Sequence, residues 1–524
     1  MSLPEHVALI GCGFTGTSAF YQLVDKYPVK EITIFEASGI YGPGYPYRSD
    51  ECKDYLLNNT TDTLCLTPDN KHAFLNWMKT RPDLETEIDE RGNLPRVYYG
   101  YFLEDVFKSS LTGAAIKNIK INLISEEVSD LYETKNKSVL INWSNGSIEV
   151  DKVILTTGHC PPKDVYEKPA IRSNTVYFAN HVNEKSLDNI AIDAKVHILG
   201  ASLSAFDVVG RLFSNESGCQ FERNEKGELA YIAGSNKREI ILCSRSGRLK
   251  KMKSYKPKQI DRRHFTLAHL TSLDKGEGIT LTDVVEAIKK DCDLNGGNID
   301  YEEVISPYLD CHTENDVNQK AALILEKDLK AAKTGDARNI LVDIFGDAGI
   351  EIWECFAAHI LSGDEEKKYR QKFETATLTY EASCPILTAE KLLALHRAGV
   401  LKIIKGVKTV TFSKDDDAYI IEHEFGNDHA TVLINTTGSV DRDVTSSAQP
   451  ELFRNMVSNG LLAPYHCEGT PMLGADVDMN NFRVTGTNNI HMANMMLWGP
   501  GFYTSGAIIM ATIVDRILKS MFNE

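Results

Sequence analysis

Short apolar runs that lead directly into turns of small residues recur along the chain, and this pattern is typical of buried parallel strands. The first run, residues 7–10, is followed by Gly11-Cys12-Gly13-Phe14-Thr15-Gly16, and apolar positions at helical spacing continue through residues 19–24. A second apolar run, residues 31–35, ends in Glu36. The order predicts a strand, a glycine turn, a helix and a second strand.

The glycine turn has the composition of a phosphate-binding loop. Gly11 permits the tight turn, Gly13 lets the backbone approach a pyrophosphate, and Gly16 allows the helix to pack closely on the strand. Glu36 stands 25 positions after Gly11, where its carboxylate can accept hydrogen bonds from both ribose hydroxyls. We therefore expect an ADP-ribose group here, although the turn by itself suits either NAD or FAD.

Two further apolar runs end in the same threonine-glycine turn. Residues 150–155 lead to Thr156-Thr157-Gly158, and residues 432–435 lead to Thr436-Thr437-Gly438. Between these copies, residues 195–199 precede a weaker turn in which Ser202 and Ala205 replace the second and third glycines after Gly200. This order is typical of two-dinucleotide flavoproteins, so we expect FAD in the first unit and a second nucleotide between the copies.

The second unit favours NADPH over NADH. Its next strand, residues 239–243, ends in Ser244-Arg245-Ser246, where a carboxylate would select the free 2′-hydroxyl of NAD. An arginine flanked by hydroxyls instead offers a bidentate cation and hydrogen-bond donors to the 2′-phosphate of NADP. The alternative is that Arg245 is an ordinary surface residue in a domain whose nucleotide site has decayed.

The predicted fold class is α/β, with two Rossmann-like dinucleotide-binding domains. Residues 1–165 form the first segment of the FAD-binding domain, residues 166–440 the NAD(P)-binding domain, and residues 441–524 the return to the FAD-binding domain. Residues from about 256 to 382 show helical periods without strand alternation. We expect this helical insertion to be either a lid over the substrate or a contact between subunits of a homo-oligomer.

Charge and composition exclude several classes of function. The chain of 524 residues has 57 Lys and Arg against 73 Asp and Glu, and its net charge of -16 repels a nucleic-acid backbone. No apolar run is long enough to span a membrane, and the strand that begins at Val7 leaves no room for a signal segment, so we expect a cytoplasmic protein.

The eleven cysteines form no CxxC pair and no zinc-like cluster, so we expect reduced thiols and no metal site. The nearest candidates for a redox pair, Cys52 and Cys65, are thirteen positions apart, which disfavours disulfide reduction.

Together these segments resemble the bacterial FAD-NAD(P)-binding family of two-dinucleotide flavoproteins, distantly related to amine N-hydroxylases and flavin-containing monooxygenases. The resemblance runs nearly end to end and includes residues 42–47, 56–59, 94–102, 200–207, 242–247 and 392–399. It implies that residues 42–47 and 56–59 lie against the isoalloxazine and that Asn59 and Arg96 lie near the flavin edge. It also implies that the last helix, capped by Thr504 or Ser505, aims its amides at the flavin pyrimidine.

The predicted cofactor-binding residues are Gly11, Gly13, Phe14, Thr15, Gly16, Glu36, Ala37, Tyr47, Asn59, Arg96, Thr157, Gly158, Gly200, Ser202, Ala205, Ser244, Arg245, Ser246, Thr437, Gly438, Gly499, Thr504 and Ser505. No catalytic side chain is assigned, because the flavin itself carries the covalent chemistry.

The resemblance implies an NADPH-reduced flavin monooxygenase whose C4a-hydroperoxide oxygenates a small molecule such as an amine, with oxygen as the second substrate. Residues 177–181 stand where flavin monooxygenases carry a Phe-Gly-His signature, but the glycine is absent and the spacing is shorter, so this segment gives no support and His181 is expected to be structural. The alternatives are an NAD(P)H-dependent electron-transfer reductase and a non-enzymatic flavin-binding sensor or interaction protein.

Overall fold

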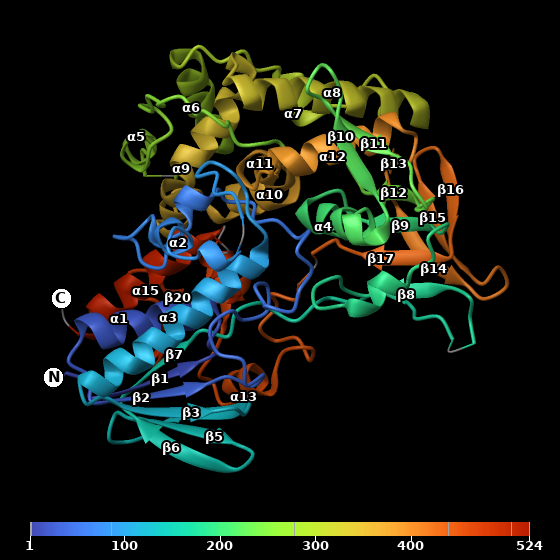
Figure 1. Cartoon of the computed structure of the whole chain (residues 1–524). Coiled ribbons are helices and arrows are strands. Elements are labelled where there is room, and N and C mark those ends of the chain that lie inside the picture. The colour runs from blue at the N-terminus through green and yellow to red at the C-terminus, as the bar shows by residue number, and fades with distance from the viewer. Residues whose placement is uncertain are drawn as a thin grey trace.

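The computed structural model describes residues 3–84, 86–170, 172–276, 278–438, 440–502, 504 and 506–522. Two mainly parallel sheets organise these residues, and helices and smaller antiparallel sheets cover them (Figure 1). No helix among the described residues is both long and apolar enough to cross a lipid bilayer.

The first sheet joins strands from both ends of the chain. In sheet order its strands are β20 (Val477–Asp478), β21 (Arg483–Val484), β22 (Ile490–Met492), β7 (Lys152–Leu155), β1 (His6–Ile10), β2 (Glu31–Phe35) and β3 (Lys120–Ile124). The pairs from β22 to β3 are parallel. Val7, Ala8 and Leu9 of the central strand are fully buried, as a continuous apolar run predicts for a strand covered on both faces.

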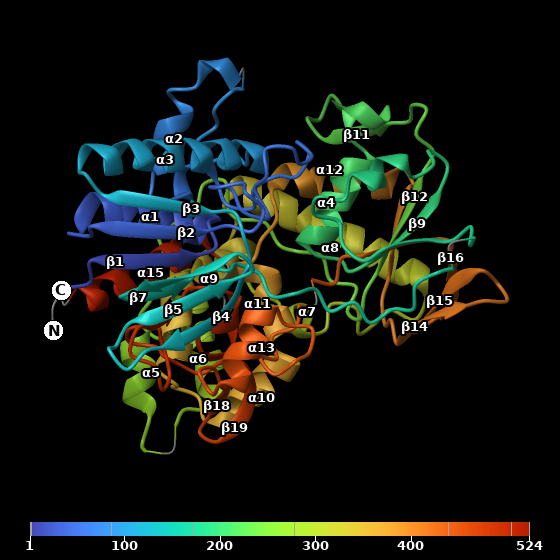
Figure 2. The same ribbon diagram turned by 90° about the horizontal axis from the view of Figure 1, so that it is seen from below.

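Helices cover one face of this sheet, and a small antiparallel sheet covers the other (Figures 1 and 2). The helices are α1 (Phe14–Lys26), α3 (Arg96–Ile116) and α15 (Ala507–Met521), and the small sheet consists of β4 (Val128–Glu133), β5 (Val139–Trp143) and β6 (Gly146–Val150). The remaining elements near this domain are α2 (Ala73–Met78), α13 (Glu451–Ser458), β18 (Pro464–Cys467), β19 (Thr470–Ala475) and α14 (Trp498–Gly501).

The second sheet is entirely parallel and repeats the plan of the first. Its strands, in sheet order, are β13 (Leu401–Ile404), β12 (Glu239–Cys243), β9 (Lys195–Leu199), β17 (Val432–Asn435) and β8 (Val176–Phe178). Around it lie α4 (Leu203–Leu212), α12 (Ile386–Arg397), the hairpin of β10 (Gln220–Arg223) and β11 (Leu229–Ile232), and the antiparallel β14 (Thr409–Ser413), β15 (Ala418–His423) and β16 (Gly426–Ala430). The predicted α/β class with two Rossmann-like domains is confirmed.

The insertion is helical, as predicted, and it bridges the two domains (Figure 1). Its helices are α5 (Leu267–Leu273), α6 (Leu281–Leu294), α7 (Tyr301–Ile305), α8 (Glu314–Thr334), α9 (Ile340–Ala357), α10 (Gly363–Lys372) and α11 (Glu374–Glu381). Val317 and Leu325 of α8 share a core with Ile403 in the second domain. Trp353 of α9 stacks on Phe482 in the C-terminal segment of the first domain, with ring centroids 5.9 Å apart.

Candidate functional site

The carboxyl ends of β1, β2 and β7 and the N-terminal ends of α1 and α15 surround a cleft of about 310 Å³. Ligands of open α/β sheets bind at this position, outside the carboxyl ends of the strands. The predicted residues that line the cleft are Gly11, Gly13, Phe14, Thr15, Glu36, Tyr47, Thr157, Gly158 and Thr504. Segments far apart in the sequence therefore converge on one site.

Glu36 is held in place at the edge of this cleft. The backbone amide of Cys12 donates a hydrogen bond to its Oε2 at 2.9 Å, and the hydroxyl of Ser38 donates to its Oε1 at 2.7 Å. The Ser38 amide also donates to Oε1, at 3.1 Å, whereas Oε2 keeps a further lone pair. Glu36 can thus still accept hydrogen bonds from ribose hydroxyls.

The loop of residues 42–47 packs directly on the glycine turn. The amide of Gly42 donates to the carbonyl of Cys12 at 2.8 Å. Gly44 has a φ of +62°, and a Cβ at this position would lie 2.7 Å from the Cα of Gly13. The two glycine backbones are in contact and leave no room for a side chain between the loop and the turn. This close packing places Tyr47, at the end of the loop, in the wall of the cleft.

Among the described residues, no side chain caps the helices that point at the cleft. The N-cap of α1 is Gly13 and that of α15 is Gly506, and neither makes a side-chain hydrogen bond to its helix. The prediction that Thr504 caps the last helix is therefore wrong, because the chain enters the helix two residues later; Ser505 lies outside the described residues. The uncapped amides remain available to an anion or a carbonyl.

Thr504 instead lines the cleft with a buried hydroxyl. Its side chain is fully buried, and its Oγ1 has no hydrogen-bond partner among the described residues. A buried polar atom without a partner calls for an explanation, and a ligand that accepts its hydrogen bond provides one. Together with Glu36 and the uncapped amides, this hydroxyl gives the cleft the donors and acceptors that FAD requires.

The two threonine-glycine turns make the same contact in the two domains. The hydroxyl and the amide of Thr156 both donate to the carbonyl of Ile10, at 3.1 and 2.9 Å. The hydroxyl and the amide of Thr436 both donate to the carbonyl of Leu199, at 2.8 and 2.9 Å. Each threonine thus fixes the strand end that precedes its own glycine turn, and the second domain copies the first.

Arg245 places an exposed positive charge just after the end of β12. Its side chain is exposed and makes no ion pair with any described residue. The Ser244 hydroxyl accepts a hydrogen bond from the amide of Gly247 at 2.9 Å, which shapes the turn around Arg245.

The weaker glycine turn after β9 keeps the predicted backbone. Gly200 has a φ of +121°, and Ser202 is the N-cap of α4 without a side-chain cap bond. Ala205 is fully buried beneath this turn.

Other predicted residues lie away from the first cleft. Gly16 packs against the carbonyl of Gly11, Ala37 is exposed beside Glu36, and Gly499 packs against the backbone of Leu473. The Asn59 Oδ1 accepts a hydrogen bond from Lys253 Nζ at 2.7 Å. The remaining predicted residues of the second domain, Ser246, Thr437 and Gly438, lie in the turns after β12 and β17.

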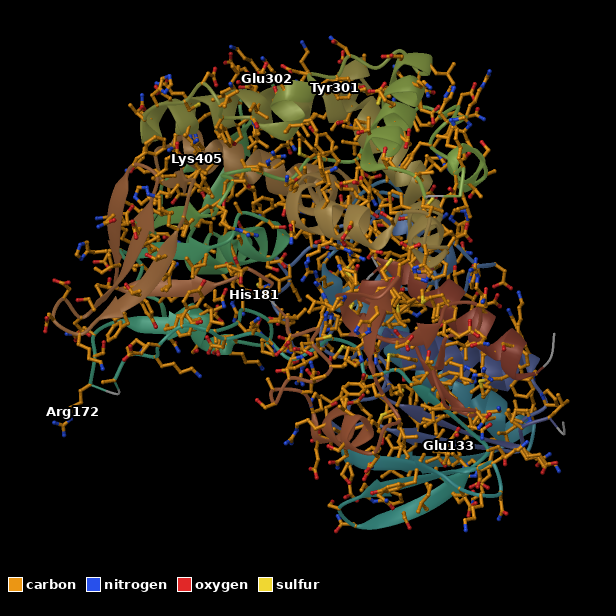
Figure 3. The ribbon with its side chains drawn as sticks, turned by 180° about the vertical axis from the view of Figure 1, so that it is seen from behind. Glu133, Arg172, His181, Tyr301, Glu302 and Lys405 are labelled. Atoms are coloured by element: carbon orange, nitrogen blue, oxygen red, sulfur yellow. The ribbon has the colours of Figure 1, made fainter. Side chains whose placement is uncertain are left out.

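Arg96, at the start of α3, reaches into the second domain. Its Nη2 lies 2.7 Å from the Oδ2 of Asp207 in α4, and both side chains are largely buried. His181 contacts the same carboxylate, with Nε2 at 3.6 Å from Oδ2, and lies between the two domains (Figure 3). This buried position agrees with the structural role expected of His181.

The cleft has further lining residues beyond the predicted set, although Gly44, Tyr45 and Pro46 belong to the segment 42–47 that the resemblance placed at the flavin. The cleft is also lined by Cys12, Ser38, Ile40, Gly44, Tyr45, Pro46, Arg48, Thr156, His159, Asn183, Asn494, Met495, Ala507 and Met510. The Asn494 amide donates to the Thr157 hydroxyl at 3.0 Å and so ties the C-terminal segment to the cleft. Asn494 stands two positions after the end of β22, and a polar residue just behind a short, mainly apolar segment was the signal that could have found it.

A cluster of half-buried and buried titratable side chains lies beside Asn59. It consists of Lys250, Lys253 and Glu381, and burial lowers the pKa of both lysines to about 8 and raises that of Glu381 to about 8. Neither carboxylate oxygen of Glu381 has a hydrogen-bond partner among the described residues. Since Glu381 ends α11, the insertion contributes titratable groups to the region where residues 56–59 are expected to meet the flavin.

Comparisons with known proteins agree with this geometry. Residues 8–160 match the model of the FAD-NAD(P)-binding family. The chain is 23% identical over 484 residues, 87% of each chain, to YdhS, an uncharacterized protein of Escherichia coli (strain K12).

Solved structures share the fold at low identity. DfoA, a cadaverine monooxygenase from Erwinia amylovora solved with FAD, is 11% identical, with a TM-score of 0.55 over 100% of this chain and 95% of DfoA. The ornithine hydroxylase PvdA from Pseudomonas aeruginosa is 12% identical, with a TM-score of 0.51 over 100% of this chain and 99% of PvdA. The family match and the cleft support FAD and NADP(H) as the cofactors.

Proposed function

We propose that this FAD-NAD(P)-binding flavoprotein is an NADPH-dependent monooxygenase that hydroxylates the nitrogen of a small amine. The reaction consumes the amine, O₂, NADPH and a proton, and it yields the hydroxylamine, water and NADP⁺. The observation that carries the proposal is the second dinucleotide turn, whose neighbouring strand ends in the unshared Arg245 and not in a carboxylate. FAD supplies the redox and oxygen chemistry when it is bound.

The residues of the first cleft hold and orient the cofactor. Glu36 accepts hydrogen bonds from the ribose, and the amides at the start of α1 meet the pyrophosphate. The N-terminal end of α15, bordered by Thr504, offers amides and a hydroxyl to the pyrimidine carbonyls, where the positive end of the helix dipole stabilises negative charge. In the second domain, Arg245 binds the 2′-phosphate that distinguishes NADPH from NADH.

The amine is chosen as the substrate class because DfoA and PvdA, which share the fold, are described as acting on cadaverine and ornithine. The insertion supports a closed reaction site, since α8 packs on the second domain and α9 on the first. A site covered in this way excludes water from the reacting atoms.

An electron-transfer reductase is the second candidate. The observation that favours it is the segment at residues 177–181, which lacks the glycine of the monooxygenase signature. Disulfide reduction is disfavoured, because Cys12 is the single cysteine among the described residues that line the cleft, and burial raises its pKa to about 12. A thiol with so high a pKa is a poor nucleophile at neutral pH.

Anaerobic mixing of the FAD-loaded protein with NADPH or NADH tests both candidates. We expect NADPH to bleach the flavin faster than NADH does, and we expect oxygen with a matching primary amine to give hydroxylamine in proportion to the NADPH consumed. Bleaching that yields only hydrogen peroxide across a panel of primary amines would favour the reductase. Failure of both nucleotides to bleach the flavin would exclude both enzymes.

Replacement of Arg245 by Ala tests the choice of nucleotide. Loss of a charge-assisted hydrogen-bond pair to the 2′-phosphate should raise the Kd for NADPH about 10- to 100-fold, while the Kd for NADH changes little. Arg172→Ala is the matched control, because Arg172 is another exposed arginine that lies far out on a loop of the same domain (Figure 3). Equal losses for NADPH and NADH in Arg245→Ala would contradict the assignment.

A further inference from the structure

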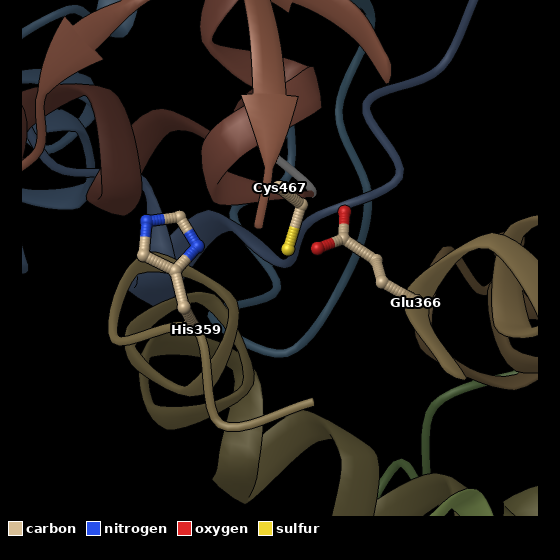
Figure 4. Close-up of side chains that lie close together, drawn as sticks. All are labelled: His359, Glu366 and Cys467. Carbon is tan, nitrogen blue, oxygen red and sulfur yellow. The ribbon is translucent and has the colours of Figure 1, made fainter. Parts of the chain in front are cut away.

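Three metal-ligating side chains meet outside both dinucleotide turns. His359, Glu366 and Cys467 each bring one ligand atom to within 4.8 Å of the other two. Figure 4 shows the imidazole, the carboxylate and the thiol pointing toward one another. His359 follows the end of α9, Glu366 lies in the first turn of α10, and Cys467 is the last residue of β18.

The donor set suits zinc. A nitrogen, a carboxylate oxygen and a sulfur are ligands of Zn²⁺, whereas Ca²⁺ and Mg²⁺ prefer oxygen alone. Glu366 and Cys467 are only 2% and 1% exposed, so they are pre-positioned by the fold. Three protein ligands leave one position of a tetrahedral zinc ion for a further ligand.

The backbone of His359 supports a role for its imidazole. The φ of His359 is +51°, which is a left-handed conformation just after the end of α9. The next amide, that of Ile360, donates back to the carbonyl of Cys355 at 3.3 Å and so ends the helix. Glycine is favoured at such a helix end, because a side chain strains the left-handed conformation. The Tyr465 hydroxyl lies 3.0 Å from His359 Nδ1 and holds the ring beside the other ligands.

The charges around the cluster balance when a divalent cation is present. The Glu366 carboxylate and a Cys467 thiolate together neutralise the two positive charges of Zn²⁺. Arg370 donates to Glu366 Oε1 at 3.0 Å, and its own charge is met by Glu374, with Nη1 3.6 Å from Oε1. With the metal bound and the Cys467 thiol deprotonated, the ion and these four side chains carry no net charge at this partly buried site.

The cluster also borders a cavity in the insertion. His359 and Glu366 line this cavity, and the rest of its wall is mostly apolar, including Phe265, Leu281 and Ile352. The cavity therefore gives a fourth ligand of the zinc ion, such as water, space beside the metal.

We propose that His359, Glu366 and Cys467 bind one Zn²⁺ ion, which fastens α9 and α10 of the insertion to β18 of the C-terminal segment. The sequence predicted no metal, because Glu366 and Cys467 are 101 positions apart and no short spacing signals the site. The site is independent of the proposed monooxygenase reaction.

Titration of the chelator-treated, FAD-loaded full chain with Co²⁺ and then Zn²⁺ tests the proposal. We expect one equivalent of Co²⁺ to give a thiolate charge-transfer band and intense d–d bands at longer wavelengths than the flavin absorbs. Zn²⁺ should abolish these bands and raise the Tm. Absence of both the bands and the shift in Tm would overturn the proposal.

Two variants and a control locate the site. Cys467→Ser should lose the thiolate band, and His359→Gly should weaken Zn²⁺ binding at least tenfold while relieving the strained φ, so that the chain still folds. His466→Ala is the control, because His466 is an exposed neighbour whose Nδ1 lies 3.0 Å from the carbonyl of Pro464. Should Cys467→Ser fail to fold, unchanged one-equivalent binding by His359→Gly would by itself overturn the proposal.

Discussion

Glu36 and Thr504 both face the first cleft and offer it opposite chemistry. The Glu36 carboxylate accepts hydrogen bonds and is oriented by the Cys12 amide and the Ser38 hydroxyl. The Thr504 hydroxyl is buried and has no partner among the described residues, so it can donate. An acceptor for ribose hydroxyls and a donor for ring carbonyls are what the two ends of FAD require.

His491 in β22 is a single residue whose burial should make stability depend on pH. Burial lowers the pKa of His491 to about 4, and its Nδ1–H donates to the carbonyl of Asn481 at 3.1 Å. Because the pKa in the unfolded chain is about 6.5, the unfolded state binds more protons between about pH 6.5 and pH 4. The free energy of unfolding should therefore fall by about 2 to 3 kcal/mol between about pH 7 and pH 4.5 through this residue.

Urea unfolding of the wild type and of His491→Gln at these two pH values isolates the contribution of His491. The variant should lose most of this pH-dependent difference, because the other titrating groups are the same in both proteins. Equal pH dependence in the two proteins would show that His491 does not keep its low pKa in the folded state.

At the scale of elements, the cleft is built from turns and helix ends that fit together through their backbones. The loop of residues 42–47 and the turn of residues 11–16 meet at Gly44 and Gly13. The helices α1 and α15 direct uncapped N-terminal ends at the space beside them. Each element leaves backbone donors free, so the cleft can bind phosphate in spite of the net charge of -16.

Replacement of Gly44 by Ala should separate the loop from the turn. The new Cβ would lie 2.7 Å from the Cα of Gly13, so the loop must move and the affinity for FAD should fall at least tenfold. Gly460→Ala is the matched control, since Gly460 has a φ of +72° and a Cβ added there would meet no atom within 4 Å. Both variants should lose about 1 kcal/mol of stability from the left-handed backbone.

FAD fluorescence titration of the two apoproteins, with thermal unfolding alongside, measures these effects. Only Gly44→Ala should lose FAD affinity. If Gly460→Ala lost as much, backbone strain and not the contact with Gly13 would be the cause.

At the scale of the whole molecule, ion pairs and the insertion hold the two domains together. Arg96 of the first domain pairs with Asp207 of the second at 2.7 Å, and Arg211 approaches Glu51 at 3.5 Å. The insertion adds apolar contacts to both domains through α8 and α9. These contacts fix the position of the FAD cleft relative to the second nucleotide turn.

Replacement of Arg96 by Ala should destabilise the chain by about 3 to 5 kcal/mol, because the largely buried Asp207 carboxylate would keep only His181, at 3.6 Å, beside it. The double variant Arg96→Met with Asp207→Leu removes both charges and should recover most of this loss. Denaturant unfolding measures the stability, and a double variant as unstable as Arg96→Ala would contradict this account. The rate at which NADPH reduces the flavin in the double variant tests the separate prediction that Arg96 lies at the flavin edge. A rate equal to that of the wild type would contradict that prediction.

The local sequence was sufficient to predict the strands and turns of both dinucleotide-binding units. Apolar runs such as residues 7–10, the glycines of the first turn and the polar residue at position 36 act through backbone conformation and burial over a few residues. The repeated threonine-glycine turns were equally visible, and each follows a strand that pairs with the strand before the glycine turn of its own domain.

Only the tertiary structure decided which distant side chains meet. The pairing of Arg96 with Asp207, the bridging position of the insertion, and the meeting of His359 and Glu366 with Cys467 depend on how whole helices and sheets pack. The position of the last helix cap at Gly506, where Thr504 and Ser505 were expected, depended likewise on the path of the chain around the cleft. The contacts of Arg96 with Asp207 and of Glu366 with Cys467 join residues 111 and 101 positions apart, and no local period or spacing encodes them.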